Sequence, residues 1–269
     1  MSLEEKNTVE SVVEHCRPVS EVLRGDLLAV HKNFEIRDTE KYQDGRNRIR
    51  GTFITPVFTD FKDYIDSKET TNIPVFVSKD NVKAVAILNY DVTGFEQGHC
   101  DHTATLELEQ TVTWKKLNDL KGQKLNQKAF ATLLEDWATV FRATTESGEL
   151  IAINEAINTV RNMTIDSNIK VDTQVNNMSQ SRSVLERVEA QSTIGKLPAY
   201  FEIDDPTYIG LDEKFIKLRL VVNSGESAPI FTLQIVKEEL LVNEIIQEFK
   251  NKVIELLPDH QVMIGTFHA

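Results

Sequence analysis

Hydrophobic positions along the chain follow two spacings, and each spacing predicts a different kind of element. The clearest helical spacing lies in residues 126–141 and 148–163, where apolar side chains recur every three or four positions. A third helical stripe runs from Leu240 to Leu257 and is stopped by Pro258. Thr55 and Pro56 are typical of the cap and first residue of a shorter helix.

Alternation of apolar and polar residues predicts the strands. It is strict from Thr103 to Trp114 and returns in residues 169–175, 216–222 and 231–235. Residues 73–78 and 82–89 form two further expected strands, and the second is apolar on both faces, which favours a central place in a sheet. Together these patterns indicate an α+β fold, with mixed, largely antiparallel sheets packed against the central helical pair and the C-terminal helix.

The same patterns divide the chain into three parts. Residues 1–50 are expected to form a short N-terminal helix and an extended segment, residues 51–258 the α+β core, and residues 259–269 a C-terminal tail. The core is either one unit or two interlocked halves, 51–165 and 166–258. Four aromatic side chains have the spacing of core residues rather than of a ligand cage: Trp114, Phe130, Trp137 and Phe141.

Composition limits the classes of function. The chain of 269 residues has 42 acidic and 30 basic residues, a formal net charge of −12. Such a chain does not gain its affinity by wrapping nucleic acid phosphates. Its two cysteines, Cys16 and Cys100, cannot build a disulfide framework. With no signal peptide and no long apolar run, the expected location is the cytoplasm, away from membranes.

Several short motifs occur in a recognisable order between Phe53 and Phe141. They are Phe61, Tyr64 and Ile65; Ala86 to Asn89; Asp101, His102 and Ala104; Val112 to Trp114; and Gly122, Gln127, Phe130, Ala131, Leu134, Glu135 and Asp136. This order resembles the uncharacterised phage and prophage family described as YfdQ-like, from about residue 50 to the C-terminal helix. The resemblance implies a phage-encoded accessory product in a bacterial cytoplasm, and it implies no catalytic residues. The chain departs from the family pattern at Thr103, where an arginine is often found.

Four potential metal ligands stand in a row: His99, Cys100, Asp101 and His102. Imidazole, thiolate and carboxylate groups all bind metal ions. Successive residues entering a strand point to opposite faces, and the other histidines are scattered, so we expect a strand-entry turn with no metal and no cofactor. The competing hypothesis is a metal-dependent hydrolase that uses His99, Asp101 and His102 with distant carboxylates.

Charged stretches supply the remaining candidate sites. A basic stretch is a candidate for phosphate contact, although neighbouring acids dilute it: Lys41, Arg46, Arg48 and Arg50. Acidic strand faces and turns are candidates for contact with a basic protein: Glu107, Glu109, Glu202, Asp204 and Asp205. No nucleophile elbow or phosphate-binding glycine loop is present in the sequence.

The sequence therefore favours a non-enzymatic, phage-encoded accessory protein that binds a host or phage macromolecule. The first hypothesis is counter-defence, in which the protein inhibits a host immune or nucleic-acid-processing complex by contacting a basic, nucleic-acid-binding protein. The alternative is an accessory role in phage DNA recombination or replication. Direct binding of nucleic acid is not expected. The strand-rich halves leave open sheet edges that another chain can cover, so we expect a homo-oligomer.

Overall fold

The computed structural model describes residues 44, 49–68, 72–90, 98–163, 196–224 and 229–268. Contacts within the chain separate Met1–Ile49 from Arg50–Ala269, and the architecture described below belongs to the second unit. The helix expected near the N-terminus and the strand expected at residues 169–175 lie outside the described residues. Within the described part the fold is α+β, as the sequence predicts.

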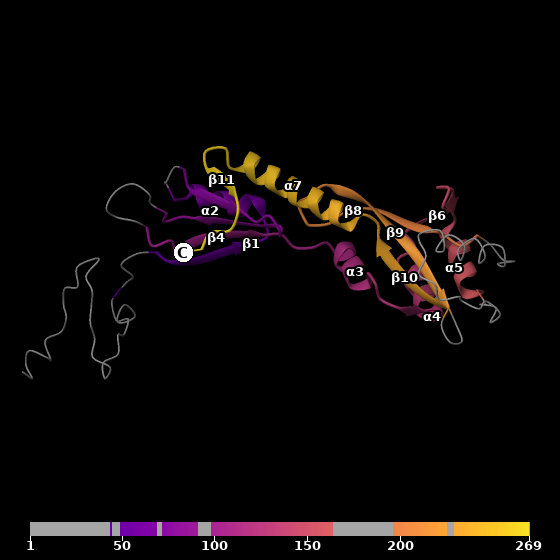
Figure 1. The fold of residues 1–269 in the computed structure, drawn as a ribbon. Helices are drawn as coiled ribbons and strands as arrows, with labels where there is room; N and C mark the ends of the chain where they lie inside the picture. Colours follow the sequence, from indigo (N-terminus) through magenta and orange to yellow (C-terminus); the bar gives the residue numbers. More distant parts are fainter. Residues whose placement is uncertain are drawn as a thin grey trace, which may run out of the picture. The chain divides into compact units, whose positions relative to one another are not determined.

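The first sheet has five strands and is mixed. In spatial order its strands are β1 (Gly51–Thr55), β4 (His102–Glu107), β3 (Lys83–Ile87), β2 (Pro74–Val77) and β11 (Gln261–Ile264). The two outer pairs, β1 with β4 and β11 with β2, are parallel, while the inner pairs are antiparallel. Helix α2 (Phe58–Asp66) lies against this sheet (Figure 1). Its buried residues are Phe61 and Ile65. The central position of β3 confirms the interpretation of its two apolar faces.

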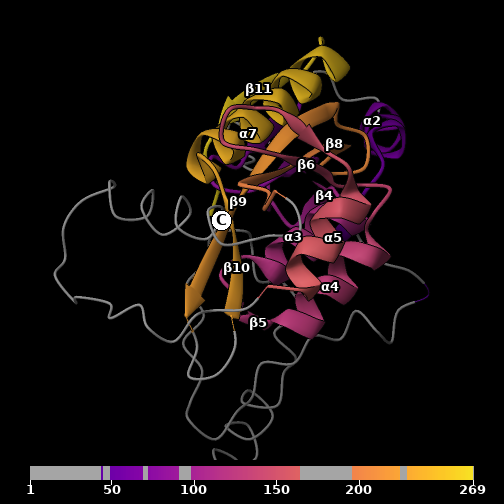
Figure 2. The same cartoon turned by 90° about the vertical axis from the view of Figure 1, so that its right-hand side faces the viewer.

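The second sheet has six strands, and all its pairs are antiparallel. In spatial order they are β5 (Leu125–Asn126), β10 (Pro229–Ile235), β9 (Glu213–Ser224), β8 (Tyr200–Pro206), β6 (Arg142–Thr144) and β7 (Leu150–Ile151). The helical pair predicted from the sequence is present as α4 (Gln127–Asp136) and α5 (Ile153–Arg161), which lie side by side (Figure 2). Phe130 of α4 stacks on Phe231 of β10 with ring centroids 4.8 Å apart.

The longest described helix, α7 (Glu238–Leu256), is amphipathic as predicted. Its apolar stripe is buried: Leu241, Ile245, Ile246, Phe249 and Val253. The ring of Phe249 packs near Phe58 of α2, with centroids 6.0 Å apart, so the stripe joins the common hydrophobic core. None of the described helices has the length and apolar character needed to cross a membrane.

The prediction of one strand from Thr103 to Trp114 is wrong in its second half. Strand β4 ends at Glu107, and helix α3 (Val112–Leu120) follows. Thr111 caps this helix, because its hydroxyl accepts a hydrogen bond from the amide of Trp114 at 3.2 Å. The alternating pattern put Val112 and Trp114 on one face, yet Val112 is 79% exposed and Trp114 only 3%. Trp114, Leu117 and Leu120 instead form the buried stripe of a short helix.

Two boundaries also differ from expectation. Helix α2 begins at Phe58 rather than at Pro56, because the hydroxyl of Thr55 accepts from the amide of Val57 ahead of the helix. The segment 259–269, which the sequence pattern marks only as a tail, contains β11. The amide of Ile73 donates to Nδ1 of His260, and the amide of Gly265 donates to the carbonyl of Val77, so both ends of the β11–β2 pair are fixed.

Candidate functional site: a charged groove beside α7

The turn between β8 and β9 is held against α2 and α7 by a glycine. Gly210 has φ +93°, a conformation that L side chains rarely adopt. A Cβ atom at this position would also lie 3.1 Å from Cε2 of Phe58. The turn can therefore approach the helices closely, and it brings the Gly210 carbonyl and Asp212 to the side of α7.

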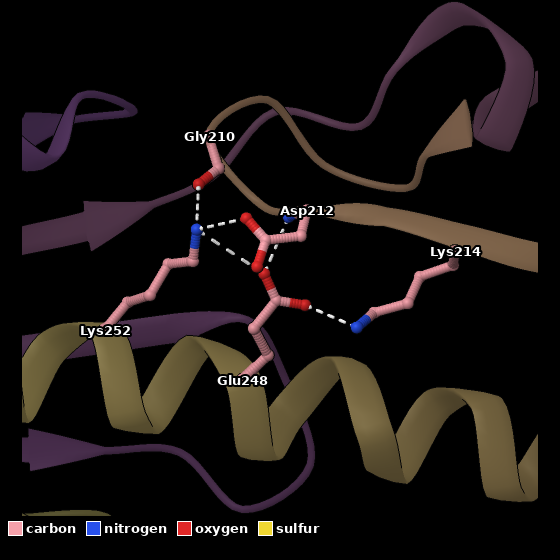
Figure 3. Close-up of polar contacts among 5 residues, drawn as sticks. All are labelled: Gly210, Asp212, Lys214, Glu248 and Lys252. Carbon is pink, nitrogen blue, oxygen red and sulfur yellow. Dashed lines mark hydrogen bonds and ion pairs between the residues drawn. The ribbon is translucent and has the colours of Figure 1, made fainter. Parts of the chain in front are cut away.

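A network of two carboxylates and two lysines joins this turn to α7 (Figure 3). Nζ of Lys252 donates to Oδ1 of Asp212 at 2.8 Å and to the carbonyl of Gly210 at 3.2 Å. Oε1 of Glu248 accepts from the backbone amide of Asp212 at 2.7 Å. Oε2 of Glu248 lies 2.7 Å from Nζ of Lys214 on β9. Glu248 is thus the centre of the network and connects α7 to the start of β9.

The electrostatics of the Asp212–Lys252 pair favour its charged form. The hydrogen bond from Lys252 lowers the pKa of the Asp212 carboxyl, and the same bond raises the pKa of Lys252. The Glu248 and Lys214 side chains are only 13% and 20% exposed, so solvent screens their ion pair less than it screens the pair of Lys252 with the exposed Asp212. We therefore expect the inner ion pair, Glu248 with Lys214, to contribute more than the outer pair to fixing the β8–β9 turn.

Beside the network lies a hollow of about 650 Å³. Its wall is formed mainly by the polar side of α7, and its lining is Asp212, Lys214, Leu240, Asn243, Glu244, Gln247, Glu248, Asn251, Lys252 and Glu255. We call this hollow the α7 groove. Its two lysines are paired within the network, whereas Glu244 and Glu255 have no ion-pair or hydrogen-bond partner in the part of the chain that the structure describes. The groove therefore presents open carboxylates, side-chain amides and one exposed leucine.

The acidic residues selected from the sequence lie elsewhere, and most of them are paired with cations. Glu202 and Asp204 share the outer face of β8, as the alternation predicts, but Glu202 pairs with Lys217 at 3.1 Å and Asp204 pairs with Arg142. Asp205 lies opposite Lys214 in the β8–β9 register. The outer face of the second sheet is consequently of mixed charge rather than acidic.

Of the other two selected acids, only Glu107 has a cation partner among the described residues. Glu107, the last residue of β4, pairs with Lys83 at 3.1 Å. Glu109 lies beyond the end of β4, so the two acids are not neighbours on one strand face, and the Glu109 carbonyl accepts from the amide of Ile209. Of the basic stretch only Arg50 is described, while Lys41, Arg46 and Arg48 lie outside the described residues.

The sequence pattern did not identify the residues of the α7 groove as a candidate site. The available signal was the polar stripe of the C-terminal helix, where Asn243, Gln247 and Asn251 follow one another at a spacing of four residues. Recognising the groove also requires Asp212 and Lys214, which reach α7 only through the β8–β9 turn. Spacing along the sequence does not reveal that contact.

Comparison with known proteins places the chain in a family. A family model described as an uncharacterized conserved protein, DUF2303, matches residues 6–267. The chain belongs to DUF2303. The match covers almost the whole chain, while the resemblance to phage and prophage proteins stays a prediction. Comparison with curated proteins and with solved structures gave no match.

The histidine segment of this DUF2303 chain is organised around hydrogen bonds. Nε2 of the buried His102 lies 3.0 Å from the hydroxyl of Tyr64 on α2, and the His102 amide donates to Oδ1 of Asn89. The Asn89 side-chain amide donates in turn to Asp101 at 2.8 Å. Cys100 has a left-handed backbone (φ +55°), so the expected strand alternation from His99 onward starts only at His102. Within the described ranges, no three His, Cys, Asp or Glu side chains form a group able to hold a metal ion.

His102 makes the stability of the protein sensitive to mild acid. Burial lowers the pKa of His102 below 6.5, Lys68 lowers it further, and Asp101 acts in the opposite direction. The unfolded chain therefore takes up the proton more readily than the folded chain, so stability that is present above pH 6.5 is lost as the pH falls through the folded pKa. We expect the urea midpoint of His102→Asn to change less between pH 7 and pH 5 than that of the wild type.

The exposed His99 provides the control for this measurement. His99→Asn should keep the wild-type pH dependence, because it leaves the buried His102 and its contact with Tyr64 in place. Equal pH dependence of the wild type and His102→Asn would contradict the assignment to His102.

Proposed function

We propose that this protein acts without catalysis, by holding a basic segment of a protein partner in the α7 groove. The observation that supports this function is the charge of the groove. Four carboxylates and two lysines line it, and both lysines are paired with Asp212 and Glu248. The remaining carboxylates, Glu244 and Glu255, line the hollow and make no ion pair with a described residue. An arginine or lysine side chain would supply that missing charge.

The length of the groove suits a short extended segment. Glu244 and Glu255 are eleven residues apart on α7, which corresponds to about 16 Å along the helix axis. An extended chain of about five residues spans this distance. Side-chain amides between the two acids, from Gln247 and Asn251, offer donors and acceptors to its backbone. Leu240 at one end offers an exposed apolar contact.

The biological setting of the proposal comes from the resemblance to phage and prophage proteins. A basic segment is the usual means by which a protein contacts nucleic acid phosphates. By occupying such a segment, this chain would inhibit a host immune or nucleic-acid-processing complex in the bacterial cytoplasm. The function is therefore proposed to be counter-defence by electrostatic competition with nucleic acid.

Binding of a fluorescent octa-arginine peptide tests the groove directly. We expect the wild-type protein to bind the peptide at low salt, with affinity that falls as salt is added. Glu244→Lys combined with Glu255→Lys replaces two attractions by repulsions, and we expect a loss of affinity of about tenfold or more. Fluorescence polarisation at about 50 mM salt measures the change.

A second double variant separates the groove from the net charge of the whole protein. Glu107→Lys combined with Glu109→Lys changes the net charge by the same amount but leaves the α7 groove intact. This control should bind octa-arginine nearly as well as the wild type. Equal losses in the two double variants, or no binding by the wild type at low salt, would overturn the groove as the site.

Affinity capture from infected bacterial cells then tests the biological setting. Tagged wild-type protein should retain a nucleic-acid-binding protein of the host defence, and the groove variant should retain much less of it. Capture of a phage replication or recombination protein instead would overturn counter-defence while leaving the groove in place.

A further inference from the structure

An uncharged and exposed strand forms one edge of the five-stranded sheet. Among the described strands β1 pairs with β4 alone, so its other side is open. No charged residue occurs from Gly51 to Thr59, although 27% of the residues in the chain are charged. The side chain of Ile54 on this strand is 64% exposed. Proteins usually protect such edges with charged residues or proline, because an open strand recruits another chain.

The backbone of β1 directs its free polar groups outward at two residues. The amide of Gly51 donates to the carbonyl of Asp101 at 2.9 Å, and β1 runs parallel to β4. In a parallel pair, every second residue directs both its amide and its carbonyl to the same neighbouring strand. Gly51, Phe53 and Thr55 therefore face β4. The amides and carbonyls of Thr52 and Ile54 point to the open edge.

These outward groups are complementary to a second copy of themselves. If two β1 strands lie antiparallel about a two-fold axis at Phe53, Thr52 of each copy lies opposite Ile54 of the other. Each of these two residue pairs then exchanges two hydrogen bonds, which gives four bonds across the interface. In this register Phe53 makes no hydrogen bond to the second copy. Its amide and carbonyl are therefore free to bond to β4. The interface is isologous and therefore closes as a dimer.

The charge and the side chains of β1 fit the same arrangement. Two copies of net charge −12 repel each other at long range, yet the strands that would meet carry no charge. Like charges directly opposite each other would destabilise the strand pair, and this arrangement places none there. Phe53 stacks on Tyr64 of α2 at 4.4 Å, so the Ile54 side chain lies on the sheet face away from α2. There it would pack against Thr52 of the second copy.

We propose that two copies of this chain associate through β1, which extends the five-stranded sheet into a continuous ten-stranded sheet. The two edges of the second described sheet are less suited to this contact. β5 and β7 are two residues long, which is too short to recruit a strand. The proposal is independent of the α7 groove, since no groove residue lies on β1.

Light scattering over a range of protein concentrations tests the dimer. Because short edge contacts belong to the weak class of interfaces, the measurement should reach about 100 µM. We expect the wild-type mass to rise from 30.6 kDa towards twice that value. Ile54→Lys should remain near 30.6 kDa at every concentration, since each lysine would take the place of the Ile54 contact with Thr52 and the two lysines would lie diagonally across the seam, about 7–8 Å apart. Ile264→Lys on the β11 edge is the matched control and should associate like the wild type.

Hydrogen exchange measured by NMR tests the register of the contact. Protection of the Thr52 and Ile54 amides should increase with protein concentration, whereas protection of the Phe53 amide, already bonded to β4, should not. A wild-type mass that stays at 30.6 kDa up to about 100 µM would overturn the proposal. So would a dimer that Ile264→Lys abolishes and Ile54→Lys preserves, because that result would place the contact at β11.

Discussion

Replacing Phe130 with alanine is expected to lower the free energy of unfolding by about 3–5 kcal/mol. The Phe130 side chain is fully buried where α4 packs on the second sheet. Its ring stacks on Phe231 at 4.8 Å and meets Phe201 edge-on at 6.0 Å. Truncation removes both ring contacts and leaves a cavity that three separate elements would have to shift to fill.

Urea unfolding followed by far-UV circular dichroism measures this loss. Phe215→Ala is the matched control, because Phe215 lies on β9 of the same sheet but is largely exposed on its outer face. We expect the control to change stability by no more than about 0.5 kcal/mol. Similar losses in the two variants would show that Phe130 does not form the centre of this core.

The elements that the sequence predicts correctly are those with one buried stripe and a clear boundary. Helix α7 is an example, since Leu241, Ile245 and Phe249 recur at a spacing of four and Pro258 follows the helix. Strand β3 is another, because a strand that is apolar on both faces has to lie between two others. In both cases the spacing of the apolar residues follows from how that one element is buried, so it can be recognised without its neighbours.

Prediction fails where neighbouring elements decide the local structure. Between Thr103 and Trp114 the alternation continues by coincidence across the end of β4, and Thr111 caps a helix there. The Thr111 hydroxyl also donates to the carbonyl of Pro206 at 2.7 Å, so residues about ninety positions later help to place that cap. Strand β11 likewise depends on its partner β2, which lies almost two hundred residues earlier.

The candidate site was missed for the same reason. Sequence reasoning selected acids that cluster along the chain, such as Glu202 and Asp204, and these prove to be paired with cations across the sheet. The open carboxylates lie instead on α7, where Glu244 and Glu255 are separated by eleven residues. An excess of acid in the sequence predicts unpaired surface carboxylates, but only the folded arrangement shows which acids lack cations among the described residues.

Replacing Glu248 with alanine is expected to lower the free energy of unfolding by about 1–3 kcal/mol and to loosen the β8–β9 turn. The variant leaves Nζ of Lys214 without its carboxylate at 2.7 Å, and the amide of Asp212 loses its acceptor. Both groups are attached to the start of β9, so the turn loses its main connection to α7. Glu248→Gln should cost less than Glu248→Ala, because its carbonyl oxygen still accepts from Asp212.

Urea midpoints of three variants on the same helix distinguish this network from general effects of charge. Glu255→Ala removes a carboxylate of α7 that has no ion-pair partner among the described residues, and it should change stability by no more than about 0.5 kcal/mol. The expected order of destabilisation is Glu248→Ala, then Glu248→Gln, then Glu255→Ala. If Glu248→Ala proves as stable as Glu255→Ala, the network does not hold the turn, and the wall of the α7 groove must be fixed by the packing of Gly210 against Phe58.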